Sequence, residues 1–117
     1  FINKTPPTGK SIICIDDYNI KKILSKIKNQ NILTYGENKK ADYQIKKIKY
    51  DFDSTTFDLS FQVKGKKNFN IKDINVKLLG RHNVLNAAAA FIICLNLGAN
   101  INMIKKHLKI FLVFKEE

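Results

Sequence analysis

The sequence predicts an α/β fold, in which a parallel sheet is flanked by helices and carries a small antiparallel strand section. Three observations support this prediction. Two short apolar runs enclose an amphipathic helical stretch within residues 11–36. Strand-like segments, several with alternating apolar and polar residues, then occupy much of residues 44–78. Two helical segments follow, the first of them rich in alanine.

The first predicted unit is a strand-helix-strand crossover. Ser-Ile-Ile-Cys-Ile at residues 11–15 is a continuous apolar run, as in a strand that is buried on both faces. Asp16 or Asp17 would cap the following helix, which we expect to run to about Lys28. A second strand at residues 31–35 ends at Gly36, so the two strands should pair in parallel through a right-handed crossover. The helix carries one apolar stripe, made of Ile20, Ile23, Leu24 and Ile27.

The middle of the chain predicts an antiparallel meander. Its strands are expected at residues 44–51, 54–63 and 68–78, with a hairpin turn at residues 65–67. Alternation in the second strand places its side chains on two faces, with Phe57, Leu59 and Phe61 on one and Asp58, Ser60 and Gln62 on the other.

Two helices complete the predicted fold. The first should run from Arg81 to Leu97 and stop at Gly98. Its alanines, at residues 87–90, would allow close packing against the sheet. Asn100 or Asn102 would cap the second helix, which we expect to end near Phe111.

Composition is that of a globular domain and limits the class of partner. The chain has 117 residues and a formal net charge of +11, but Arg81 is the single arginine among 21 basic residues. Lysine, asparagine and isoleucine, whose codons are A/T-rich, are all abundant, and the lysines are spread along the chain. This distribution is typical of a solvated surface, so we predict no nucleic-acid partner. No apolar run reaches the ~18 residues of a membrane span, so we predict no membrane partner either.

Cysteine and histidine positions predict no metal site in this chain. Cys14 and Cys94 lie inside apolar segments, which favours buried free thiols and a cytoplasmic location. His107 sits among lysines and is interpreted as a surface residue. Neither His82 nor His107 has partners at metal-ligand spacing.

Two other motifs receive ordinary structural interpretations. Residues 8–11, Thr-Gly-Lys-Ser, resemble the end of a phosphate-binding loop, but Lys4 stands where the motif needs glycine, and a strand follows instead of a helix. We interpret them as a polar turn. Asp16 and Asp17 end a strand and could position Mg²⁺ beside a nucleotide, but helix capping is the interpretation we favour.

The run at residues 80–90, Gly-Arg-His-Asn-Val-Leu-Asn-Ala-Ala-Ala-Ala, carries the strongest functional signal. It places His82, Asn83 and Asn86 in the first turns of a helix that follows an extended segment. Asn83 and Asn86 stand three residues apart and therefore share a helix face. A side-chain amide matches the N6/N7 edge of adenine with two hydrogen bonds. These three residues are our candidate nucleotide-base site.

The same run resembles the Mur ligase family, in the Gly-Arg-His-Asn-Val-Leu-Asn-Ala segment followed by a helix that ends in Leu97-Gly98. Further similar stretches lie at residues 1–4, 14–17, 34–36 and 41–42, in family order. These flanking matches favour the member that adds L-alanine to UDP-N-acetylmuramate. The resemblance implies a three-domain cytoplasmic enzyme of peptidoglycan synthesis. Residues 1–110 would be the C-terminal half of its central ATP-binding domain, and residues 111–117 the start of a linker to a C-terminal domain.

The resemblance also implies the chemistry. ATP would convert the muramoyl carboxylate into an acyl phosphate, and the alanine amine would then form the amide bond. Asn83 and Asn86 would contact the adenine, with His82 near the base. The phosphate loop and the Mg²⁺ ligands would lie upstream of Phe1, and the two substrates would bind through other domains. We therefore expect the isolated chain to be inactive.

Two alternatives stay open at the level of sequence. The absent phosphate loop and a tail at residues 111–117 that lacks the family's glycine and arginine pair would fit a non-catalytic remnant or small binding module. The high positive charge would fit a basic nucleic-acid-binding domain.

Overall fold

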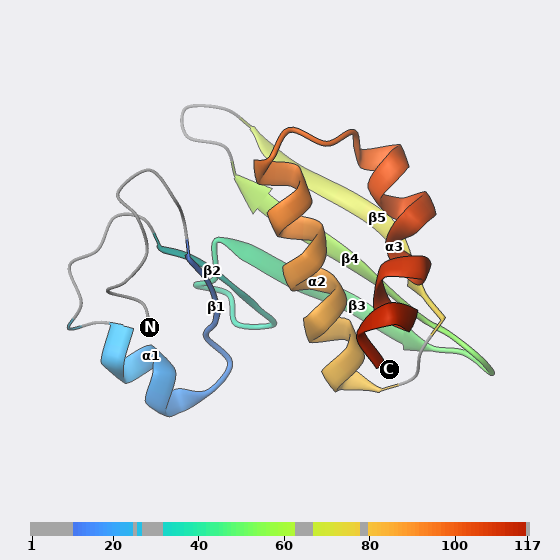
Figure 1. Ribbon diagram of the computed structural model, residues 1–117. Helices are drawn as coiled ribbons and strands as arrows, with labels where there is room; N and C mark the ends of the chain where they lie inside the picture. The colour runs from blue at the N-terminus through green and yellow to red at the C-terminus, as the bar shows by residue number, and fades with distance from the viewer. Residues whose placement is uncertain (1–10, 25, 27–31, 63–66, 78–79, 117) are drawn as a thin grey trace.

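The computed structural model describes residues 11–24, 26, 32–62, 67–77 and 80–116, with the backbone alone for residues 109–116. Five strands form one mixed sheet in the order β1-β2-β3-β4-β5. Figure 1 shows α2 and α3 side by side across one face of this sheet. The predicted α/β class is confirmed. The elements are β1 (Ser11–Cys14), α1 (Tyr18–Leu24), β2 (Ile32–Gly36), β3 (Tyr43–Tyr50), β4 (Thr55–Gln62), β5 (Asn68–Val76), α2 (Arg81–Asn96) and α3 (Ile101–Glu116).

The strand-helix-strand unit is present as predicted. β1 and β2 pair in parallel, from Ser11 opposite Ile32 to Cys14 opposite Tyr35. α1 ends at Leu24, and most of its predicted extension to Lys28 lies outside the described residues. No residue of α1 is buried, so its apolar stripe does not join the core over the residues described. The reason is visible in Figure 1, where α1 lies away from the sheet face that α2 covers.

The pairing of β2 with β3 is a feature that the sequence did not predict. These strands also pair in parallel, but they overlap only at Tyr35 opposite Tyr43 and Gly36 opposite Gln44. Parallel neighbours usually need a connection of about a dozen residues or more. Residues 37–42 suffice here because β3 begins beside the end of β2 and continues beyond it.

β3, β4 and β5 form the predicted antiparallel meander, which is larger than the small section expected. A β-bulge lies on each side of β4, between Lys46 and Lys49 on β3 and opposite Phe57–Leu59 on β5. Lys47 and Asp73 have positive φ values of 52° and 58° at these irregularities. An extra residue shifts the side-chain alternation by one. The hairpin turn predicted at residues 65–67 lies almost wholly outside the described residues.

The core lies between the sheet and the two C-terminal helices. Phe57 and Leu59 of β4 are fully buried against a cluster that includes Val84, Ala87 and Phe91 of α2. The small side chains of α2 let this helix lie close to the sheet, as predicted. The prediction of buried free thiols is corrected in part, because Cys14 and Cys94 are free but only half-buried.

The ends of the two C-terminal helices follow from their glycine and proline content. After α2, the N–H groups of Gly98 and Ala99 donate to Leu95 and Cys94 O, which is a Schellman motif, so Gly98 is the predicted stop. α3 continues to Glu116, beyond the end expected near Phe111, since no glycine or proline interrupts residues 101–116. The predicted domain boundary at residues 110/111 stays a prediction.

Candidate functional site at the start of α2

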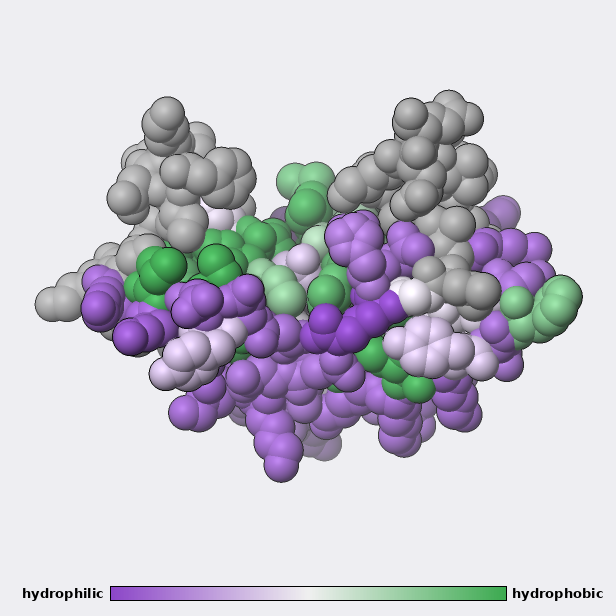
Figure 2. Space-filling view, turned by 90° about the horizontal axis from the view of Figure 1, so that it is seen from below, coloured by the Kyte–Doolittle hydropathy of each residue, from purple (hydrophilic) through white to green (hydrophobic). Residues whose placement is uncertain are grey.

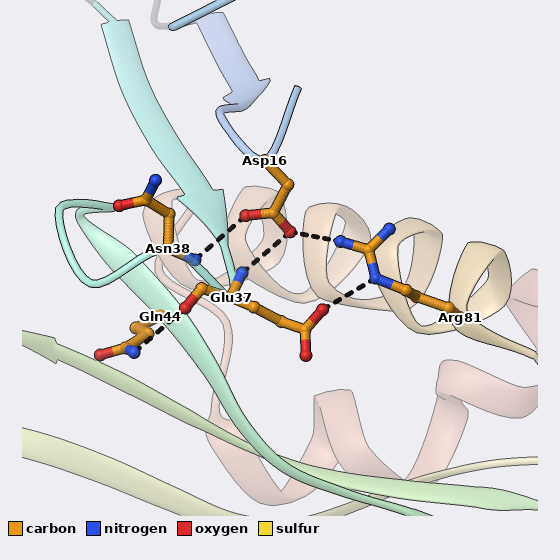
Figure 3. A network of polar contacts seen from close by, with 5 residues as sticks. All are labelled: Asp16, Glu37, Asn38, Gln44 and Arg81. Carbon is orange, nitrogen blue, oxygen red and sulfur yellow. Dashed lines mark hydrogen bonds and ion pairs between the residues drawn. The ribbon is translucent and has the colours of Figure 1, made fainter. Parts of the chain in front are cut away.

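The first turn of α2 lies at the carboxyl ends of β1 and β2. Arg81 Nη2 donates to Asp16 Oδ2 at 2.7 Å, and Arg81 Nε donates to Glu37 Oε2 at 2.8 Å (Figure 3). Asp16 follows β1 by two residues, and Glu37 directly follows β2. The carboxyl ends of parallel strands are where α/β sheets bind their ligands. We call Asp16, Glu37, Asn38 and Arg81 the Arg81 cluster.

Asp16 is the centre of the Arg81 cluster. Its two carboxylate oxygens accept the backbone N–H groups of Glu37 and Asn38, each at 3.0 Å, in addition to Arg81. The Asp16 side chain is only 13% exposed. Gly36 has φ of 145°, and a Cβ at that position would overlap the Asp16 carboxylate. Glycine at position 36 is therefore what allows Asp16 to reach the loop after β2.

Arg81 remains charged in this setting. The hydrogen bond from its guanidinium to Glu37 raises the pKa of Arg81 above its ordinary value, and the negative charges of Glu37 and Asp16 add to this. The Arg81 side chain is 48% exposed and that of Glu37 is 47% exposed. The pair with Glu37 is therefore a solvated ion pair, while the pair with Asp16 is the less exposed of the two.

The two acidic residues after β1 have separate roles. Asp17 Oδ1 accepts the N–H groups of Asn19 at 2.8 Å and Ile20 at 3.3 Å, which confirms helix capping for this residue. Asp16 instead binds Arg81 and the loop after β2. Over the part of the chain that the structure describes, no three histidine, cysteine or acidic side chains come together as a metal site.

The candidate base-binding residues lie on the part of α2 next to the Arg81 cluster. His82 is exposed, and Asn83 and Asn86 are half-buried, whereas Val84 and Ala87 face the core. The motif thus keeps its polar side chains out of the interior, as a binding role requires. Adenine contact by His82, Asn83 and Asn86 stays a prediction.

Figure 2 looks at the end of the molecule where α2 begins. Hydrophilic residues cover most of the lower part of this view, and hydrophobic residues show mainly at the upper left, with smaller groups elsewhere. This end of the molecule is therefore mixed in polarity.

Two cavities elsewhere do not include the candidate residues. One, of about 170 Å³, is an apolar cavity between α2 and α3, and one of about 160 Å³ lies over the two bulges of the sheet. The first is lined by Ala90, Cys94, Ile104, His107 and Leu108. The second is lined by Lys47, Lys49, Thr56, Asp58, Lys72 and Asp73.

Sequence reasoning did not predict the Arg81 cluster. It assigned no role to Arg81 or Glu37, and it placed Asp16 only as a helix cap or a residue beside Mg²⁺. One sequence feature could have indicated a special role for Arg81, because it is the single arginine in a chain whose other 20 basic residues are lysine. The planar guanidinium of arginine holds its donors at fixed positions, so it binds two carboxylates better than a lysine ammonium does.

Comparison with known proteins is consistent with this geometry. A profile of the Mur ligase middle domain matches residues 1–94, which is most of the chain. The chain belongs to the Mur ligase family. UDP-N-acetylmuramate–L-alanine ligase of Pelagibacter ubique is 47% identical over 111 residues, covering 95% of this chain and 24% of the relative. The ligase of the same name from Maricaulis maris is 33% identical over 98 residues, covering 84% of this chain and 21% of the relative.

Solved structures of other Mur ligases have a similar fold. A UDP-N-acetylmuramoyl-L-alanyl-D-glutamate–2,6-diaminopimelate ligase superposes with a TM-score of 0.66 at 26% identity, over 86% of this chain and 20% of that one. The D-alanyl-D-alanyl-adding ligase of Acinetobacter baumannii superposes with a TM-score of 0.65 at 25% identity, over 89% of this chain and 22% of that one. The chain therefore spans about a quarter of the relatives it matches. None of the helices described here is long and apolar enough to cross a membrane.

Proposed function

We propose that this chain supplies the adenine-binding side of an ATP-dependent ligase that joins L-alanine to UDP-N-acetylmuramate in peptidoglycan synthesis. The observation that carries this proposal is the position of the α2 start, with Asn83 and Asn86, at the carboxyl ends of β1 and β2. The activity named for the Pelagibacter ubique and Maricaulis maris relatives supports the choice of substrates. The proposed reaction takes place in the cytoplasm.

Each candidate residue has a chemical role in this proposal. The amides of Asn83 and Asn86 would bind the N6/N7 edge of adenine, since an amide offers a donor and an acceptor side by side. His82 would lie against the base. The mixed polarity of this end of the molecule suits a flat apolar ring with polar edges (Figure 2).

The bond-forming chemistry needs more than this chain. In the proposed reaction the muramoyl carboxylate takes the γ-phosphoryl group of ATP, giving an acyl phosphate and ADP. The alanine amine then attacks the acyl carbon, forms the amide and releases phosphate. Phosphoryl transfer depends on cationic groups placed around the transferred phosphate. The family resemblance implies that the Mg²⁺ ligands and the phosphate loop lie in other parts of the ligase, and we assign both there.

Replacing Asn86 by Ala in the ligase tests the proposal. ATP binding should weaken by ~1–3 kcal/mol, the scale of one bidentate base contact. Purine riboside triphosphate lacks the N6 amino group. Its affinity should therefore change less between the parent ligase and the variant than the affinity of ATP does. Asn70→Ala, at an exposed position on β5, is the matched control and should leave nucleotide affinity unchanged. An Asn86→Ala ligase with parental ATP affinity would refute the assignment.

A separate measurement addresses the isolated chain. We expect it to show no ATP turnover, because a base contact alone does not stabilise the charge that develops in phosphoryl transfer. Turnover by the isolated chain would contradict the assignment of the phosphate-binding groups to other parts of the ligase.

A further inference from the structure

We propose that Arg81 is a positioning residue, whose bridge between Asp16 and Glu37 sets the place of the base-binding turn of α2 relative to the sheet. The inference rests on the proposed function, because it concerns how Asn83 and Asn86 are held. Arg81 itself would not touch the nucleotide. The Arg81 side chain binds two carboxylates of this chain, Asp16 at 2.7 Å and Glu37 at 2.8 Å.

Helix α2 begins without a side-chain cap. Its N-cap is Gly80, which makes no side-chain capping hydrogen bond. Gly80 has φ of 104° and ψ of 150°, a backbone region that is essentially restricted to glycine. The side chain of Arg81 is the link that ties this first turn to both strand ends (Figure 3).

The partners of Arg81 are themselves held by the sheet. Asp16 is bound by the N–H groups of Glu37 and Asn38, over the glycine at position 36. The backbone carbonyl of Glu37 accepts from Gln44 Nε2 at 3.2 Å, so the loop after β2 is also tied to β3. The two carboxylates that Arg81 binds are therefore also linked to the ends of β1 and β2 and to β3.

The bridge requires the shape of arginine and not only its charge. Arg81 uses Nε and Nη2, two donors at a fixed spacing in one plane, for two different carboxylates. A lysine ammonium is a point charge on a flexible stem and does not fix two acceptors in one plane. Arginine stands here in a chain whose other 20 basic residues are lysine.

Loss of the bridge should affect nucleotide binding more than folding. The half-exposed pair with Glu37 contributes about 1 kcal/mol or less to stability. Without Arg81, the Asp16 carboxylate keeps the backbone N–H groups of Glu37 and Asn38 as partners. A bidentate amide–base contact, by contrast, needs its groups held to within about 0.5 Å and 10–20°. A small displacement of α2 would therefore weaken base recognition while the chain stays folded.

The test uses the whole ligase with Arg81→Met and Arg81→Lys. For Arg81→Met we expect the KM for ATP to rise about tenfold, on the scale of one bidentate base contact. The preference for ATP over purine riboside triphosphate should fall in parallel, while kcat and the KM for the UDP-sugar stay within about twofold. Arg81→Lys should recover only part of the ATP preference. Lys46→Met, which removes one exposed positive charge from β3, is the matched control and should behave like the parent.

The outcomes separate this inference from the proposed function. If Asn86→Ala lowers the ATP preference and Arg81→Met does not, Arg81 has no positioning role and the base-binding assignment stands. If neither variant changes nucleotide affinity, the proposed function itself fails. If Arg81→Met weakens both nucleotides equally, Arg81 acts through its charge. If it raises the KM of every substrate and lowers the melting temperature, its role is general stability. Either of these last two results also overturns the inference.

Discussion

Thr34 and Asp42 are joined by three hydrogen bonds across the base of the loop between β2 and β3. Asp42 Oδ2 accepts from Thr34 N at 2.9 Å and from Thr34 Oγ1 at 3.2 Å, and Asp42 N donates to Thr34 Oγ1 at 2.9 Å. This reciprocal pair closes the loop immediately before β3 begins. It stabilises the short connection between two parallel neighbours, which the offset of β3 along β2 makes possible.

We predict that Asp42→Ala destabilises the protein by about 1–2 kcal/mol, because it removes two hydrogen bonds to a charged acceptor at an exposed site. Urea unfolding gives the free energy directly. Thr34→Val should have a similar effect, and the double variant should be much less destabilised than the sum of the two. Strict additivity would mean that the two side chains do not act as a pair.

Gly36→Ala should be among the more damaging single changes in this chain. The new Cβ would overlap the Asp16 carboxylate, and alanine would be strained at φ of 145°. We expect a loss of about 2–4 kcal/mol, from strain together with the displaced Asp16 hydrogen bonds. Gly98→Ala is the control, since it also has positive φ but meets no atom within 4 Å. Equal losses at the two positions would show that the contact with Asp16 is unimportant.

Asn100 and Asn102 offer a paired test of helix capping. Asn100 Oδ1 accepts the N–H groups of Asn102 at 2.9 Å and Met103 at 3.3 Å, so Asn100 is the cap of α3. Asn100→Ala should lower stability by about 1 kcal/mol. Asn102→Ala, within the helix and exposed, should change it by less than about 0.5 kcal/mol. Thermal melting of the two variants compares them; a larger effect at Asn102 would contradict the assignment.

Cys14 should be a slow nucleophile. Burial raises the pKa of the Cys14 thiol above its ordinary value of 9.0, and the thiolate is the reactive form. In a Cys94→Ser background, iodoacetamide should modify Cys14 more slowly in the folded protein than in the urea-unfolded chain at the same pH. Equal rates would argue against burial of the thiol.

The same shift predicts a pH dependence of stability. Below pH 9.0 the thiol is protonated in both the folded and the unfolded chain, so it contributes no change. As the pH rises past 9.0, the unfolded thiol ionises first, which lowers the free energy of unfolding. Cys14→Ser should remove this part of the alkaline loss.

The order of strands and helices could be predicted because each has a local signal. The apolar run at residues 11–15, the alanines of α2 and Gly98 each indicate one element by themselves. The bulges could not be predicted from alternation. Ile45 and Ile48 both pack on the core although they are three residues apart, because Lys47 is the extra residue between them.

Only one part of the candidate site could be predicted from the sequence. The asparagines of α2 are neighbours along one helix, so a single motif reveals them, although their contact with adenine is still a prediction. The Arg81 cluster brings together three segments, with Asp16 and Arg81 65 positions apart. No local pattern encodes such a meeting. It depends on β1 and β2 lying in parallel register and on α2 crossing their ends.

The two N–H groups held by Asp16 belong to Glu37 and Asn38, yet the carboxylate that holds them is also bound by the start of α2. Their deuterium exchange should therefore follow the departure and return of that helix from the sheet. The exchange rates of these two N–H groups would therefore report how often the start of α2 leaves the sheet, in solution and without nucleotide or an activity assay.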